Sequence, residues 1–188
     1  MMNNIGVGGP GPGRIPVWRI LGWGGAVMLI LTPWVAMRFT PEVRWEAHDF
    51  IFATVVIGIT GALIELTILL TSNWLSRAGG CVAVLAGFLV FWSNLAIGMI
   101  GHEGDSVNLL FSLVLLIAII GAWLSSLHRN VLPAAMLAAG TTQCAIGLLA
   151  GIWGSDFKGG VLTVLLSTLW WISSLLFAIA AKQKAPAD

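Results

Sequence analysis

A single glutamate stands inside a long apolar stretch of this sequence. Glu65, in the segment "GALIELTILL", is the only charged residue between Asp49 and Arg77. A carboxylate at membrane depth is costly unless it is protonated or paired, and such residues commonly serve proton transfer or helix contacts. Two states therefore stay open for Glu65: neutral and hydrogen-bonded, or ionised and paired with Arg77 or Arg19.

The spacing of small residues before Glu65 predicts which way it faces. Helical steps back from it give one narrow face, formed by Thr54, Gly58, Gly61 and Ala62. A face of small residues lets a neighbouring helix approach closely. We therefore expect Glu65 to face protein, not lipid, near the cytoplasmic end of its span.

Two amide side chains lie deeper in apolar stretches. Asn94 and Gln143 are about 12–16 residues from the cytoplasmic ends of their predicted spans, roughly 18–24 Å at the rise of an α-helix. Such amides usually form hydrogen bonds between helices, each contributing about 1 kcal/mol or less. The alternative is that they line a path for a solute or an ion.

Histidine and carboxylate pairs occur at the span ends on the side of the membrane opposite the cytoplasm. His48–Asp49 and His102–Glu103 occur at span ends, and further acids follow nearby at Glu42, Glu46, Asp105 and Asp156. Histidine with carboxylates can bind a divalent metal. The simpler interpretation is a solvated surface, with Asp49 capping a helix N-terminus.

Several catalytic signatures are missing from the sequence. The predicted spans contain no His and no Lys, and the chain has no H-E-x-x-H, P-loop or C-x-x-C motif. We therefore expect a protein that is not an enzyme and holds no cofactor or metal. Cys81 and Cys144 are interpreted as buried small residues without a disulfide.

The composition defines the class of protein. The chain has 188 residues, of which 58% are hydrophobic and 9% charged, and its mean hydropathy is +0.95. Several stretches approach the roughly 20 apolar residues that a helix needs to cross a bilayer. The sequence therefore predicts an all-α membrane protein embedded in a lipid bilayer. The net charge of +1, without a basic run, argues against nucleic acid.

Six spans are predicted, joined by short connections into one bundle. Their ranges are about 17–38, 49–71, 78–100, 107–126, 131–153 and 159–181. Residues 1–16 and 182–188 are predicted as a flexible Gly/Pro-rich tail and a short C-terminal tail. The basic residues favour one side by six to three, which predicts cytoplasmic termini: Arg14, Arg19, Arg77, Arg129, Lys182 and Lys184 against Arg38, Arg44 and Lys158.

A faint internal repeat relates the third and fourth spans to the fifth and sixth. "SNLAIGMI" at 93–100 matches "TQCAIGLL" at 142–149 in residue type, and "WLSS" and "WISS" follow at a similar offset. A parallel duplication would place Asn94 and Gln143 at one depth. Chance similarity in a chain of this composition is the rival interpretation.

Tryptophan occurs both near span ends and in mid-span. Seven of the ten are interpreted as interfacial: Trp18, Trp23, Trp34, Trp45, Trp74, Trp123 and Trp153. Trp170 and Trp171 lie near the middle of the last span, where we expect packing in the bundle. The alternative is contact with a lipid-soluble ligand.

Two stretches resemble a known group of proteins. "FTPEVRWEAHDF" at 39–50 and "NLAIGMIGHE" at 94–103, followed by Asn108, are similar to a family of small uncharacterised bacterial inner-membrane proteins. The resemblance implies a bacterial inner-membrane setting and no mechanism. It also implies interest in particular residues: Glu42, Trp45, Asp49, Glu65, Asn94 and Glu103.

The expected function is that of an accessory or assembly subunit of a larger inner-membrane complex. Small size, missing catalytic groups and Trp-rich surfaces favour this role, with a protein partner or a homo-oligomer. The alternative is a small proton- or cation-coupled transporter or channel that uses Glu65, Asn94 and Gln143, with Asp49 and Glu103 at its acidic mouth.

Overall fold

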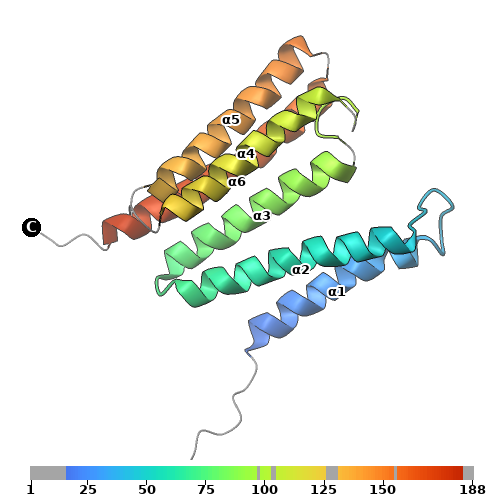
Figure 1. The fold of residues 1–188 in the computed structure, drawn as a ribbon, viewed down its shortest axis with the longest axis horizontal. Helices are drawn as coiled ribbons and strands as arrows, with labels where there is room; N and C mark the ends of the chain where they lie inside the picture. Colours follow the sequence, from blue (N-terminus) through green and yellow to red (C-terminus); the bar gives the residue numbers. More distant parts are fainter. Residues whose placement is uncertain (1–15, 97, 103–104, 126–130, 155, 184–188) are drawn as a thin grey trace, which may run out of the picture. The chain divides into compact units, whose positions relative to one another are not determined.

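All regular structure in the described part of the chain is helical. The computed structural model describes residues 16–96, 98–102, 105–125, 131–154 and 156–183. Six of its helices are long and apolar enough to cross a membrane (Figure 1). This confirms the prediction of an all-α chain with six spans, and the protein is a multi-pass membrane protein.

The helix bounds lie within a few residues of the predicted spans. The helices are α1 (Val17–Ala36), α2 (Ala47–Leu70), α3 (Trp74–Ala96), α4 (Leu110–Leu124), α5 (Val131–Trp153) and α6 (Phe157–Gln183), and a 3₁₀ turn, η1 (Ser106–Leu109), precedes α4. The main difference is that α3 ends at Ala96 and not near residue 100. Gly98 and Gly101 follow with φ of 66° and 67°, a left-handed conformation that favours glycine and ends the helix.

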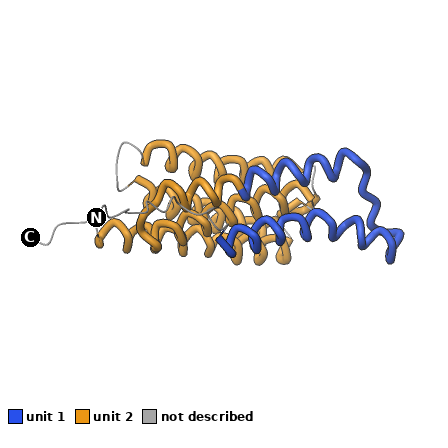
Figure 2. Tube along the Cα trace, turned by 90° about the horizontal axis from the view of Figure 1, so that it is seen from below, with its two compact units in different colours: residues 1–61 blue, residues 62–188 orange. Residues whose placement is uncertain are grey.

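The chain divides into two compact units, residues 1–61 and 62–188 (Figure 2). Unit 1 contains α1 and the first part of α2. None of the residues of α1 is buried. Its tightest glycine contact is at Gly61, where an added Cβ would lie 3.1 Å from the Trp23 ring. Unit 1 therefore has little interior of its own.

Unit 2 contains the core of the protein. Its α6 packs against both α5 and α3, and α5 also packs against α4. The fully buried apolar side chains come from all four of these helices and include Val90, Phe111, Val114, Met136 and Trp170.

Glycines bring α5 and α6 into close contact. A Cβ added at Gly147 would lie 2.9 Å from the carbonyl oxygen of Gly160, and one added at Gly160 would lie 2.8 Å from the Cα of Gly151. Gly147 and Gly151 form a G-x-x-x-G pair, the pattern that lets membrane helices approach at backbone distance. A larger residue at Gly147 or Gly160 would force the two helices apart.

The two copies of the suspected repeat have different local structures. Residues 142–149 all lie within α5, whereas the matching segment leaves its helix after Ala96 and turns at Gly98. Asn94 consequently lies two residues before the end of α3, and Gln143 lies ten residues before the end of α5. The structure gives no support to the duplication or to a shared depth for the two amides.

Candidate functional site

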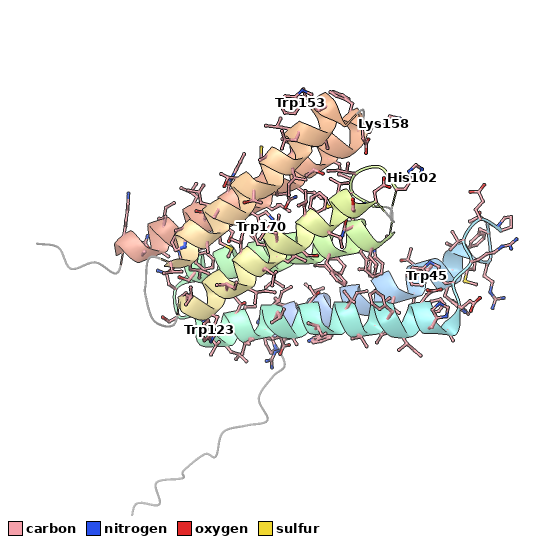
Figure 3. All side chains as sticks on the ribbon, turned by 45° about the horizontal axis from the view of Figure 1, so that its top comes forward. Trp45, His102, Trp123, Trp153, Lys158 and Trp170 are labelled. Carbon is pink, nitrogen blue, oxygen red and sulfur yellow. The ribbon has the colours of Figure 1, made fainter. Side chains whose placement is uncertain are left out.

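A row of buried polar side chains runs along α6. Thr163, Ser167, Trp170, Ser173 and Ser174 are all buried. Their spacing of three or four residues places them on adjoining parts of one helix face. Trp170 lies among the helices in Figure 3, whereas Trp123 and Trp153 lie at helix ends. This agrees with the expectation that Trp170 packs inside the bundle.

Gln143 connects α5 to this row. Its Nε2 donates a hydrogen bond to the backbone oxygen of Thr163 at 3.2 Å, and its Oε1 accepts one from the indole Nε1 of Trp170 at 2.8 Å. The Gln143 side chain is 0% exposed and Trp170 is 1% exposed. Both ends of the amide are thus engaged in holding two helices together, the structural role expected for it.

Two serines of α6 extend these bonds to both neighbouring helices. The Ser173 hydroxyl donates to the backbone oxygen of Gly79 in α3 at 2.8 Å, and the Ser174 hydroxyl donates to that of Pro133 in α5 at 2.7 Å. We did not single out these serines from the sequence. The signal was the recurrence of Gly160, Thr163, Ser167 and Ser174 at helical spacing in an apolar span.

Asn108 organises the turn between α3 and α4. Its Oδ1 accepts a hydrogen bond from the backbone N–H of Ile100 at 3.1 Å. Its Nδ2 donates to the carbonyl oxygens of Ile100 at 3.1 Å and His102 at 2.7 Å. Asn108 is buried, as are Met99 and Ile100. One side chain therefore provides hydrogen-bond partners for the backbone groups of a turn that packs into the core.

Asn94 belongs to this turn and not to the Gln143 network. Its Nδ2 donates to the backbone oxygen of Asn108 at 3.2 Å. The buried Oδ1 of Asn94 has no hydrogen-bond partner among the described residues. Gln143 and Asn94 therefore act at separate places in unit 2.

Asp156 ties the same turn to the start of α6. Its Oδ2 accepts from the backbone N–H of Gly101 at 2.7 Å, and its Oδ1 accepts from that of Gly159 at 2.9 Å. The hydrogen bond from Gly101, followed by that from Gly159, lowers the pKa of the Asp156 carboxyl below its ordinary value. We define the α3–α4 junction as Asn94, residues 98–102, Asp105, Asn108 and Asp156.

The carboxylates and histidines do not assemble a metal centre in the described part of the chain. Among the residues described, no group of three or more His, Cys, Asp or Glu side chains could hold a metal ion. Glu103, which we included as a candidate, lies outside the described residues. At the junction, Asp105 instead accepts a hydrogen bond from the backbone N–H of His102 at 2.8 Å.

Asp49 lies in the first turn of α2, where it acts on the helix end. Its Oδ2 accepts a hydrogen bond from the backbone N–H of Glu46 at 2.8 Å. The rings of Trp45 and Phe50, on either side of this bond, pack edge to face with centroids 5.3 Å apart. This combination of a back-reaching carboxylate and a hydrophobic staple fixes how the chain enters a helix. It gives residues 45–50 of the stretch at 39–50 a structural explanation.

Glu65 is half-buried and lies five residues before the end of α2. The face of small residues leading to it is packed unevenly. Gly61 meets the Trp23 ring, but no described atom lies within 4 Å of a Cβ added at Gly58. Thr54, further back on the same face, is exposed.

The three polar residues selected for a transport path lie at three levels. Glu65 is about 8 Å from the end of α2 at 1.5 Å per residue, and Asn94 is about 30 Å from the start of the adjoining α3. Gln143 lies near the middle of α5. The described structure brings no two of them into one site.

Comparisons with known proteins add no relative. No family model, no curated protein and no solved structure matches the chain.

Proposed function

We propose that this protein is a non-catalytic accessory or assembly subunit of a larger complex in a bacterial inner membrane. In this proposal, unit 1 contacts a transmembrane helix of the partner. The observation that carries it is the state of α1. The helix has no buried residue, and no described atom lies within 4 Å of a Cβ added at Gly22, Gly24 or Gly25.

Glycine in a helix needs a compensating contact. Each interior glycine destabilises a helix by roughly 0.5–1 kcal/mol relative to alanine. Membrane helices recover this cost when the missing side chain lets another backbone approach. Gly22 and Gly25 are three residues apart and share one face of α1, so a partner helix that packs there would use them together.

The state of unit 2 also favours a structural role. The Gln143 amide, the Trp170 indole and the hydroxyls of Ser173 and Ser174 are engaged in bonds between helices. The transport alternative would require Glu65, Asn94 and Gln143 to act together on one path. The three residues lie at different positions along their helices, which favours the structural role over transport. A flux of ions that depends on Glu65 would favour the transport alternative.

The proposed orientation has both termini in the cytoplasm. It is tested by labelling single cysteines in intact cells, after Cys81 and Cys144 are replaced by alanine. We expect a membrane-impermeant thiol reagent to reach Glu103→Cys but not Arg129→Cys. The reverse labelling pattern would invert the topology.

Co-purification tests the subunit role. A tagged chain is extracted in mild detergent, and the amount of partner retained is compared between Gly25→Leu, Gly25→Ala and the wild type. We expect Gly25→Leu to lose the partner and Gly25→Ala to keep most of it, because leucine fills the open face and alanine barely does.

The matched control is Ala145→Leu, which adds a similar side chain at an exposed small residue of α5. It should retain the partner at the wild-type level. A chain that purifies alone in all variants, with unchanged yield, would refute the subunit role.

A further inference from the structure

An open apolar groove lies between α4 and α5. It is shallow and open to the outside along its length, with a volume of about 530 Å³. Gly121 and Ala135 are among its lining residues, and a Cβ added at Gly121 would overlap that of Ala135, so the two helices meet there. Ile120, Ala134 and Ala138, which are exposed, also line it. All the lining residues have hydrocarbon side chains or none, so the groove offers no polar side chain to a ligand.

The groove is open on a side of the helices that suits lipid. Neighbouring residues on α4 and α5 are large and apolar, with Leu116 52% exposed, Ile119 64% and Leu137 51%. In a chain with six helices able to cross a membrane, an exposed surface of this composition suits contact with lipid hydrocarbon. An unfilled groove there would deprive its walls of dispersion contacts.

The length of the groove decides between a lipid chain and a helix. Its lining residues run from Ile117 to Leu124 on α4 and from Val131 to Ala138 on α5. Each range corresponds to about 10 Å along the helix axis. Half of the bilayer core is about 15 Å thick, so the groove lies within one leaflet. A transmembrane helix would cross both leaflets, whereas an acyl chain belongs to one.

The geometry points to a binding site for one acyl chain of a bilayer phospholipid in the groove between α4 and α5. In this site, the acyl chain of the lipid lies along Ala134 and Ala138, against Ile120 and close to Gly121. Trp123, which is 71% exposed near the end of α4, marks the level at which the lipid head group meets water. Because the lining lacks charge, the site recognises the chain and not the head group. This inference is independent of the proposed partner.

Photo-labelling tests the site. The full chain is reconstituted into phosphatidylcholine liposomes that contain a phosphatidylcholine with a diazirine on one acyl chain, then irradiated, and the labelled residues are located by mass spectrometry. We expect labelling in the groove to exceed that at Leu165, an exposed residue of α6, by about threefold. Replacing phosphatidylcholine by phosphatidylglycerol should leave this ratio unchanged.

Variants of α5 distinguish a site from general lipid contact. Ala138→Phe fills the groove and should lower its labelling to the Leu165 level. Ala145→Phe is the matched control, since Ala145 is an exposed alanine of α5 that does not line the groove, and labelling should persist. Ala134→Phe replaces the first variant if that one fails to fold.

Equal labelling at the groove and at Leu165, or an equal loss in Ala138→Phe and Ala145→Phe, would refute the acyl-chain site. Disulfide trapping provides a second measurement. Ala138→Cys, in a chain without Cys81 and Cys144, should stay monomeric under oxidation. A disulfide-linked dimer would show that the groove holds a second copy and not lipid. A phosphatidylglycerol preference would assign recognition to the head group and overturn the proposal as stated.

Discussion

Two glycine-rich parts of this protein are packed very differently. In α5 and α6, Gly147 and Gly160 lie where a side chain would collide with the neighbouring helix. In α1, glycines 22, 24 and 25 have no described atom within 4 Å of an added Cβ. Glycine content alone therefore does not identify a close helix contact. What identifies it is the partner across the helix pair, such as Gly160 for Gly147.

The largest predicted effect comes from filling one of the tight positions. Gly147→Leu should destabilise the protein by about 3 kcal/mol, because an extra side chain in a packed interior forces the backbones apart. We expect a lower unfolding midpoint in detergent, measured by circular dichroism. Gly24→Leu in α1 is the control and should not lower the midpoint, since leucine favours helix more than glycine does. An equal loss of stability in Gly147→Leu and Gly24→Leu would show that the two glycine-rich regions are not packed differently.

The second prediction asks whether the tight region extends to the α3–α4 junction. Asn108→Ala removes three side-chain hydrogen bonds and leaves buried groups of Ile100 unsatisfied. We expect a loss of about 2 kcal/mol in the free energy of unfolding, the size usual for buried polar groups without partners. Asn108→Asp keeps the acceptor for the Ile100 N–H but places a carboxylate oxygen against the carbonyl oxygens of Ile100 and His102, so it should lose at least as much. Wild-type stability in Asn108→Ala would mean that the junction contributes nothing to the core.

A smaller effect is expected from the polar bond between α5 and α6. A double-mutant cycle of Gln143→Leu and Trp170→Phe isolates the bond between these two side chains from their packing. We expect a coupling energy of about 0.6 kcal/mol, the average for such bonds in a membrane interior. The measurement is unfolding in mixed micelles. A coupling of zero would show that the bond between Gln143 and Trp170 does not help to hold α5 against α6.

The smallest expected effect is the pH dependence of the hydrogen bonds from Gly101 and Gly159 to Asp156. The folded-state pKa of Asp156 is lowered from the ordinary 3.8, so its contribution is present above that value and is lost as the pH falls through the lowered pKa. Wild type should be more stable than Asp156→Asn near neutral pH, and the difference should begin to shrink below about pH 3.8 and be lost once the pH is below the lowered pKa. Thermal melts of both proteins in one buffer series measure it. A constant difference across the series would show that the charge of Asp156 is not involved.

The sequence was sufficient for the six helices because continuous apolar runs leave few alternatives in a membrane. It also indicated that Gln143 and Trp170 belong to the interior. It was insufficient at residues 97–101, where apolar residues continue but Gly98 and Gly101 turn the chain, so α3 was predicted about four residues too long. The segments "NLAIG" and "QCAIG" have similar residue types, which suggested a repeat. The structure does not support it, because only the second segment lies wholly within a helix. The partners of Asn108 and Asp156 depend on contacts between distant segments, which spacing alone does not give.

The bond between Ser173 and Gly79 has a consequence for biosynthesis. These residues are 94 positions apart, and α3 has its main helix contact with α6, which is made after the other five described helices. At about 5–20 residues per second, α3 waits roughly 5–20 s in the bilayer before its partner is synthesised. By contrast, α6 follows α5 directly and can pair with it as soon as it inserts. We therefore expect α3 to dock onto a preformed α5–α6 hairpin. A ribosome that stalls before residue 173 would leave α3 without the hydrogen bond from Ser173.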